Sequence, residues 1–257
     1  MKYIVCIKQV PSTNEVRLDP ETHAIIRDGR QSVINPFDLY AVELAKRLKE
    51  KTGGTLTALS MGIPATERLL REAVSRGADN AVLLTDRAFA GSDTLATSYA
   101  VSLGVRSAGG AELILCGKMA VDGDTAQIGP ELAETLGIHH VTDVCEVIDI
   151  TDKDITVKKL TESGTVTLKV AYPAVITVVK DIAEPALPSI AGVRKSMDAP
   201  FKVFSAADAD ADTARTGFAG SPTNVVKTFT PEGRTEAMPV AAEDAARFIL
   251  DALKEVR

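Results

Sequence analysis

Residues 112–136 read ELILCGKMAVDGDTAQIGPELAETL and hold the three parts from which the fold is built. The run ELILCG is short and apolar, as is typical of a buried strand. VDGDTAQIGP at 121–130 is a polar loop with two aspartates around Gly123, and a helix is expected from there to Leu136. A buried strand, a loop of small residues and a helix form the repeating unit of α/β proteins, which bind ligands beyond the carboxyl ends of their strands.

The same alternation of strand and helix runs through the first half of the chain. We expect strands at 3–10, 55–62, 81–86 and 112–117, and helices at 35–51, 64–76, 94–107 and from about 124–127 to 136. Asn35 and Pro36 suit the N-cap and the first position of the first helix. Because the strands are almost continuously apolar, the pattern predicts an α/β fold with a mostly parallel sheet and helices on both faces.

The second half of the chain has a different character. Residues 141–150, 154–161 and 165–179 read as strands joined by short turns, which predicts an antiparallel edge of the same sheet. The other segments are expected to form a hairpin insertion, a Pro-rich surface loop, an extended tail and a terminal helix at 16–34, 181–200, 205–222 and 240–256.

Composition argues against several classes of protein. The net charge is −6 and the pI is about 5.2, whereas nucleic-acid-binding domains normally carry a basic surplus. No apolar run reaches the ~18 residues of a membrane span. The N-terminus lacks the apolar core of a signal peptide, so a cytoplasmic location is expected.

The cysteines and histidines do not suggest a metal site. The number of cysteines is odd and no Cys-x-x-Cys motif occurs, which argues against a disulfide framework or a zinc site. We expect buried thiols in a reducing cytosol at Cys6, Cys116 and Cys145. We expect surface or strand-edge positions for His23, His139 and His140.

The loop at 121–130 combines carboxylates with small residues, so two kinds of chemistry have to be weighed. Asp122 and Asp124 partly resemble the nucleophile and general acid of haloacid-dehalogenase-like phosphatases. However, Ala126 stands where those enzymes have threonine or valine, and the first aspartate does not follow its strand directly. An EF-hand needs a bidentate glutamate at its twelfth position, where this chain has Ala133, so a calcium loop is excluded.

The other possibility is a phosphate cradle at the start of the following helix. The first N–H groups of a helix have no partner within it and lie at its positive end, so they bind phosphate oxygens. Gly123 lets the backbone approach a ligand, and Thr125 and Gln127 add neutral donors. Asp124 would cap the helix, and Asp122 would accept hydrogen bonds from a ribose or from backbone donors. An acid-rich N-cap without a ligand is the alternative interpretation.

Parallel topology brings three further stretches to the same edge of the sheet. Residues 6–9, 60–63 and 117–120 each end or follow a predicted strand, so they would converge on one crevice. Neither a G-x-G-x-x-G motif after the first strand nor a Walker A motif occurs. This argues against a standard Rossmann dehydrogenase and against a P-loop NTPase.

Several motifs, taken in order, carry a resemblance to a known family. They are VCIKQVP at 5–11, INPFD at 34–38, ALSMG at 58–62, RGADNAVLLTD at 76–86 and CGKMAVDGDTAQIGPELAE at 116–134. Together they resemble the β subunit of an electron-transfer flavoprotein (ETF), and the resemblance covers nearly the whole chain. It implies an adenine-nucleotide α-hydrolase-like α/β domain, a C-terminal arm and a nucleotide bound at the strand ends.

The resemblance also implies which residues contact the nucleotide. The matching positions are Cys6, Asn35, Pro36, Phe37, Asp38, Met61, Gly117, Lys118, Met119, Ala120, Val121, Asp122, Gly123, Asp124, Thr125, Ala126, Gln127 and Ile128. Simple members of the family hold a structural AMP there, whereas electron-bifurcating members hold a second FAD. The small residues of DGDTAQIGP, and SPTNVVKTFTP at 221–231, resemble the bifurcating group, so FAD is expected and AMP is the alternative.

In the bifurcating group, NADH reduces the flavin of the β subunit and the electrons then divide. One passes through the flavin of the α subunit to an acyl-CoA-type dehydrogenase, and the other goes to ferredoxin or flavodoxin. The chain would act as a subunit of this NADH-oxidising complex without a catalytic side chain of its own, because the flavin does the chemistry. The alternatives are a conventional AMP-binding β subunit and a nucleotide-binding stress-type module that shares only the fold.

The resemblance divides the chain into two functional parts. Residues 1–200 are expected to form the nucleotide-binding domain, which includes a recognition loop at 181–200 that docks on the dehydrogenase. The residues expected to make the apolar contact are Leu187, Pro188, Ser189 and Ile190. A solvated Pro-rich loop is the alternative. Residues 201–257 are expected to form the arm and the helix that contact the α subunit.

Overall fold

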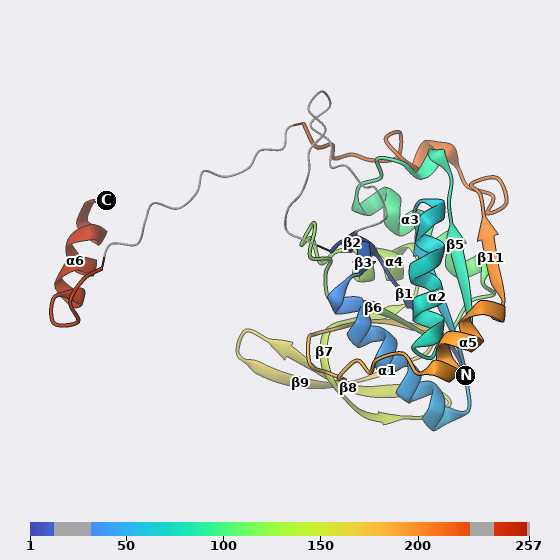
Figure 1. Ribbon diagram of the computed structural model, residues 1–257, viewed down its shortest axis with the longest axis horizontal. Helices are drawn as coiled ribbons and strands as arrows, with labels where there is room; N and C mark the ends of the chain where they lie inside the picture. Colours follow the sequence, from blue (N-terminus) through green and yellow to red (C-terminus); the bar gives the residue numbers. More distant parts are fainter. Residues whose placement is uncertain (13–31, 227–238, 256–257) are drawn as a thin grey trace. The chain divides into compact units, whose positions relative to one another are not determined.

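The computed structural model describes residues 1–12, 32–226 and 239–255, and these belong to two compact units, Met1–Val225 and Val226–Arg257. A nine-stranded sheet forms the centre of the first unit (Figure 1). Its strands are β1 Lys2–Cys6, β4 Thr55–Met61, β5 Asn80–Leu84, β6 Leu113–Gly117, β7 His139–Ile150, β8 Asp154–Thr161, β9 Gly164–Ala171, β10 Ala174–Val178 and β11 Phe201–Phe204.

β1 lies near the middle of the sheet, whose order is β11-β5-β4-β1-β6-β10-β7-β8-β9. Each neighbouring pair from β11 to β7 is parallel, and β8 and β9 add an antiparallel edge. In register, Val5 of β1 lies beside Ala58 of β4 and Leu115 of β6. The predicted α/β fold, a mostly parallel sheet with antiparallel edge strands, is confirmed.

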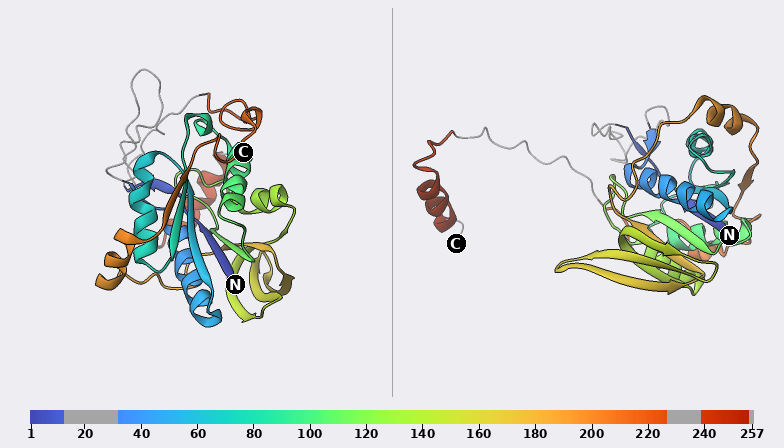
Figure 2. Two further views of the ribbon diagram at one scale, coloured as in Figure 1. Left: turned by 90° about the vertical axis from the view of Figure 1, so that its right-hand side faces the viewer. Right: turned by 90° about the horizontal axis from the view of Figure 1, so that it is seen from below.

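Helices cover both faces of the sheet, as the left view of Figure 2 shows. They are α1 Pro36–Thr52, α2 Glu67–Ser75, α3 Thr94–Ser107 and α4 Ile128–Leu136. The first two pack on one face and the last two on the other. Successive residues of β1 therefore enter different cores, since Val5 packs with α1 and Ile4 packs with α3. This burial on both faces explains why the strands read as continuous apolar runs.

The segment 165–179, expected to be one strand, forms two strands in different places. β9 is the outer edge of the sheet, whereas β10 lies inside it between β6 and β7. The two are separated at Pro173, which has no N–H group to continue a ladder. All residues of β10, with the sequence AVITV, are buried, so this run suits a central parallel strand covered on both faces.

Two segments predicted to be irregular are ordered on the domain. α5 Ile190–Asp198 occupies the second half of the predicted loop 181–200 and packs against α2. Residues 205–222 fold back over α3 and do not form an extended tail, since the Asp212 N–H donates to the Tyr99 hydroxyl at 3.0 Å. Contacts with residues far away in the sequence hold both segments, and local periodicity cannot show such contacts.

Of the expected insertion at 16–34, only residues 32–34 are described. β2 Gln9–Pro11 and β3 Ser32–Ile34 form an antiparallel pair. Residues 16–31 of the predicted hairpin, which include His23, lie outside the described residues. None of the helices in the described part of the chain has both the length and the apolar character needed to cross a membrane.

The second unit is described at residue 226 and at 239–255. It contains α6 Ala245–Glu255, which begins later than the predicted terminal helix. Within this unit the large apolar side chains of α6 are exposed, namely Phe248, Ile249, Leu250 and Leu253. Residues 201–225, which the resemblance assigns to the arm, belong to the first unit. Contact of the arm with an α subunit stays a prediction.

Candidate functional site

The carboxyl ends of β1, β4 and β6 lie on adjacent strands near the first turn of α1. Cys6, Met61 and Gly117 end these three strands. α1 begins so close to β6 that a Cβ atom on Gly117 would lie 2.7 Å from the carbonyl carbon of Phe37 and 2.8 Å from the nitrogen of Asp38. Glycine therefore lets two motifs that are far apart in the sequence meet. We call residues 6–8, 35–38, 61 and 117–128 the rim site.

Asp38 is the buried hydrogen-bonding centre of the rim site. Its carboxylate accepts the N–H of Lys8 at 2.8 Å and the N–H of Gly117 at 3.2 Å. Burial raises the pKa of Asp38 to about 7, although hydrogen bonds from Lys8, Asn35 and Gly117 act in the opposite direction. One side chain thus joins the ends of β1 and β6 to α1 from inside the core.

Asn35 holds the loop that follows β6. It lies at the N-cap of α1 and Pro36 follows it, as predicted, but its side chain makes no capping hydrogen bond. Instead, Nδ2 donates to the Met119 carbonyl at 2.8 Å and Oδ1 accepts the Val121 N–H at 3.2 Å. This buried asparagine therefore fixes the path of the loop at two points.

Two lysines offset aspartate charges near this loop. Lys8 contacts Asp122 at 2.5 Å, and Lys118 contacts Asp143 of β7 at 2.7 Å. We expected Asp122 to accept from a ribose or from backbone donors, but its carboxylate is paired with Lys8 in this structure. Because the pair carries no net charge, Lys8 removes much of the repulsion between the acidic loop and an anionic ligand.

The loop 120–127 differs from the predicted start of the helix. α4 begins only after Gln127, its N-cap residue, so the prediction that Asp124 caps the helix is wrong. Asp124 (φ 53°) and Ala126 (φ 55°) adopt the left-handed conformation, which is uncommon for residues with a side chain. A turn within the loop overrides the capping preference of aspartate here, because the Asp124 N–H donates to the Ala120 carbonyl at 2.8 Å.

Consecutive backbone N–H groups at the end of this loop are candidates for binding an anion. No hydrogen bond among the described residues uses the N–H groups of Thr125, Ala126, Gln127 or Ile128. They precede or open α4, where the helix dipole favours negative charge. Gly123 already donates to the Ala120 carbonyl at 3.2 Å. The backbone N–H groups that can bind an anion are therefore those of residues 125–128, fewer than the predicted 123–128.

The three cysteines are free thiols, but only Cys116 is fully buried. Cys6 and Cys145 are partly exposed, so the expectation of three buried thiols is right for one of them. A hydrogen bond with Cys6, together with burial, raises the pKa of the Cys116 thiol, so it stays protonated at neutral pH.

The other predicted surface and metal features can be checked on the described residues. His139 and His140 begin β7 and are exposed, as expected. No group of three or more His, Cys, Asp or Glu side chains in the described ranges is placed to hold a metal ion.

Sequence reasoning missed the contribution of α3 to this end of the sheet. The Thr94 hydroxyl donates to Oε1 of Glu131 at 3.1 Å and joins the first turns of α3 and α4. Burial raises the pKa of Glu131. Asp93 caps α3 and also accepts the Thr223 hydroxyl at 2.8 Å, which brings part of the 221–231 motif to the same place. The Ser-Asp cap was visible in the sequence, but its link to Thr223 was not.

The predicted docking residues lie before and at the start of α5. Leu187 and Ile190 are 86% and 84% exposed, and Pro188 is half-buried. Ser189 is the N-cap of α5, because its hydroxyl accepts the Gly192 N–H at 3.0 Å. Docking on a dehydrogenase stays a prediction.

Comparisons with known proteins agree with this architecture. The model of the electron transfer flavoprotein domain matches residues 22–209. The electron transfer flavoprotein subunit beta of Clostridium acetobutylicum is 42% identical, over 99% of this chain and 98% of that protein. Protein FixA of Bradyrhizobium diazoefficiens is 41% identical, over 98% of this chain and 91% of that protein. The caffeyl-CoA reductase–Etf complex subunit CarD of Acetobacterium woodii is 39% identical, over 91% of this chain and 89% of that protein.

These similarities cover most of the chain at well over a third identity. The chain therefore belongs to the electron transfer flavoprotein family. Within the family it is of the β-subunit type and serves in electron transfer.

Proposed function

We propose that the chain is the β subunit of an electron-bifurcating heterodimer and binds FAD at the rim site. The observation that supports this best is the run of N–H groups at 125–128, which no described residue occupies. Their place at the start of α4 and beyond the strand ends fits the phosphates of a dinucleotide. The pairing of Asp122 with Lys8 makes the acidic loop compatible with such an anion.

Several residues in or beside the rim site have a defined part in this proposal. The 125–128 backbone binds the phosphates, Asn35 fixes the loop that leads to it, and Asp38 fixes the ends of β1 and β6. The protonated Cys116 thiol adds no charge near the ligand. FAD, when bound, supplies hydride acceptance and one-electron transfer.

The proposed partners are an α subunit that carries a further FAD, NADH as electron donor, an acyl-CoA-type dehydrogenase, and ferredoxin or flavodoxin. The relative CarD is named as a subunit of a complex with caffeyl-CoA reductase, which supports a partner that acts on a coenzyme A thioester. The proposal of NADH as donor and of ferredoxin or flavodoxin as acceptor rests on the resemblance of residues 121–130 and 221–231 to the bifurcating group. The cytoplasmic location is part of the same proposal.

Counting the bound nucleotides tests the proposal. The chain is co-produced with its α subunit, the nucleotides are released by acid, and chromatography identifies them. We expect two FAD molecules per heterodimer. One FAD and one AMP would contradict the bifurcating assignment and support a conventional β subunit. A β subunit without any nucleotide would remove the rim site from the proposal.

A substitution at Asp124 tests the position of the ligand. Asp124→Ile places a β-branched residue in a left-handed conformation, which costs about 1–2 kcal/mol and distorts the approach to 125–128. We expect lower β-site nucleotide occupancy in an intact heterodimer. Asp210→Ile is the matched control, because Asp210 (φ 50°) has the same conformation but lies outside the rim site. Equal occupancy in both variants would place the nucleotide elsewhere.

A further inference from the structure

Three arginines, on α1, on α2 and at the C-cap of α2, hold the main chain of residues 184–197. Each arginine pairs with a glutamate four residues earlier on its own helix. The pairs are Glu43–Arg47, Glu67–Arg71 and Glu72–Arg76, with N–O distances of 2.8, 2.8 and 2.9 Å. These pairs fix each guanidinium group before it reaches across to the other segment.

The free donors of each guanidinium group then bind main-chain carbonyls. Arg47 reaches the carbonyl of Glu184 at 3.3 Å, Arg76 that of Ala186 at 2.9 Å, and Arg71 those of Ser196 and Met197 at 2.7 and 3.2 Å. No side chain of the segment is used in these contacts. The side chain of Arg76 is only 14% exposed, so water competes least for its hydrogen bond.

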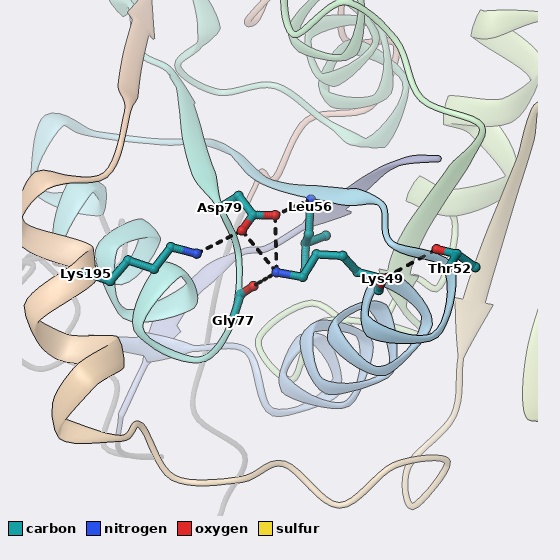
Figure 3. A network of polar contacts seen from close by, with 6 residues as sticks. All are labelled: Lys49, Thr52, Leu56, Gly77, Asp79 and Lys195. Atoms are coloured by element: carbon teal, nitrogen blue, oxygen red, sulfur yellow. Dashed lines mark hydrogen bonds and ion pairs between the residues drawn. The ribbon is translucent and has the colours of Figure 1, made fainter.

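A lysine–aspartate network fixes α5 at a further point (Figure 3). Lys195 of α5 contacts Asp79 at 2.8 Å, and Asp79 also accepts from Lys49 and from the Leu56 N–H. Burial acts to raise the pKa of Asp79, but the hydrogen bonds from Lys195, Leu56 and Lys49 outweigh it and lower the pKa. Asp79 is therefore ionised at neutral pH and keeps its contact with Lys195.

α5 also packs on α2 without a gap. A Cβ atom on Gly192 would lie 2.1 Å from the carbonyl oxygen of Ser75, so only glycine allows this contact. The opposite side of the segment presents apolar side chains to solvent. Leu187, Ile190 and Met197 are 86%, 84% and 68% exposed, and Val193 is 42% exposed.

We infer that Arg76, Arg71 and Arg47 are positioning residues for docking, which hold residues 184–197 in one conformation so that a partner protein meets a preformed apolar surface. This inference rests on the proposed dehydrogenase partner and on the predicted docking role of residues 187–190. The surface continues from Leu187 along α5 through Ile190 and Met197, so it is longer than the four predicted residues. The partner is the proposed flavin dehydrogenase, which must bury these side chains. Binding a segment that is already ordered avoids the entropic cost of ordering it.

Arg76 offers the cleanest test, because Arg71 also lies over the ring of Phe201 at 5.2 Å. Arg76→Met keeps the aliphatic stem and removes the donors. The matched control is Arg106→Met on α3, which loses a similar bond to the Thr135 carbonyl on the other face of the sheet. The probe is a purified short-chain acyl-CoA dehydrogenase, titrated with the α–β heterodimer.

We expect Arg76→Met to weaken binding about three- to tenfold, in keeping with the loss of one net hydrogen bond. Amide hydrogen exchange should rise within 184–197, and nucleotide content should not change. Arg76→Lys, which keeps a positively charged donor group, should restore part of the affinity. Arg106→Met should bind as the unaltered chain does. Unchanged exchange in 184–197, or faster exchange with unchanged affinity, would overturn the inference.

A double-mutant cycle with Leu187→Ala separates positioning from general destabilisation. If Arg76 acts by placing Leu187, then Arg76→Met should cost less affinity in the Leu187→Ala background than in the unaltered chain. Additive losses would overturn the inference. If Leu187→Ala itself leaves binding unchanged, or the unaltered heterodimer does not bind the probe, the docking part of the proposed function fails, and exchange in 184–197 still reports whether Arg76 holds the segment.

Discussion

The rim site and residues 184–197, which we call the docking segment after their proposed role, are both held by side chains that bind main-chain groups of a distant part of the chain. At the rim, buried Asp38 and Asn35 receive or donate these hydrogen bonds inside the core. At the docking segment, Arg71 and Arg76 reach carbonyls near the surface. A buried N–H group that loses its acceptor has no substitute, whereas a carbonyl near the surface can bind water. Substitutions at the rim site should therefore lower the free energy of unfolding of the domain, whereas substitutions in the docking segment should change only local stability.

The titration of Asp38 should give the largest effect at the rim. Its pKa is about 7 in the folded protein and about 4 in an unfolded chain, so the folded state binds more protons between these values. The proton bound by Asp38 therefore stabilises the folded state. This contribution to the free energy of unfolding is fully present below about pH 4 and is lost as the pH rises through 7. Urea unfolding should show a slope of up to about −1.4 kcal/mol per pH unit, which Asp38→Asn removes.

The matched control for Asp38→Asn is Asp152→Asn in an exposed turn. The control should keep the pH slope of the unaltered chain. If the free energy of unfolding has the same pH slope in Asp38→Asn and in the unaltered chain between pH 4 and pH 7, folding does not add a proton to Asp38 in this range. Asp38 would then not make the stability of the rim site depend on pH.

The close approach of α1 to β6 makes Gly117 the next most sensitive position. The Cβ atom of Gly117→Ala would lie 2.4 Å from Oδ1 of Asp38 and under 3 Å from the backbone of α1. Overpacking of this kind should lower the free energy of unfolding by about 3 kcal/mol. Gly123→Ala is the control for stability, because its Cβ atom meets nothing within 4 Å. Equal stabilities would mean that the two motifs are not packed together as described.

Removing the side chain of Asn35 should have a smaller effect with a more local signature. Asn35→Ala leaves the Val121 N–H and the Met119 carbonyl without their partner, which should cost about 2 kcal/mol of stability. Hydrogen exchange should increase at 119–128, and β-site nucleotide should be lost more readily on dilution. Exchange that rises evenly over the whole domain would show that Asn35 supports the fold rather than the loop.

The smallest effect on stability is expected in the docking segment. Lys195→Met removes the half-exposed ion pair with Asp79, which should change the free energy of unfolding by less than about 1 kcal/mol. Exchange at the amides of α5 should nevertheless rise, while exchange at 117–128 stays the same. If exchange at 117–128 rose as much as exchange in α5, the two regions would not differ in the way described.

Much of the fold could be predicted because burial on both faces leaves a direct mark in the sequence. β1, β4 and β6 read as apolar runs, and α1 carries a helical stripe between Pro36 and Gly53. β10 carries the same mark, but nothing in a run of apolar residues says which strands lie beside it. α5 was missed because it is held by Arg71 and Lys195, whose partners are far away in the sequence.

The candidate site was predictable in position but not in detail. The strand ends and the glycines indicated where the segments meet, and the structure brings 6–8, 35–38 and 117–121 together. The pairing of Lys8 with Asp122 spans more than a hundred residues, so no local spacing could reveal it. Asp124 was misassigned as a cap because its N–H group closes a turn with the Ala120 carbonyl, and the capping preference of aspartate does not reveal this competing turn.

The place of β10 has a consequence for how the protein is made. β10 lies between β6 and β7, yet it is synthesised after the β7–β8–β9 meander is complete. Until residue 178 leaves the ribosome, β6 has an unpaired edge, and so does β7 on the side that β10 later occupies. Open strand edges recruit other chains, so this stretch of translation is the interval in which the nascent protein is most exposed to aggregation.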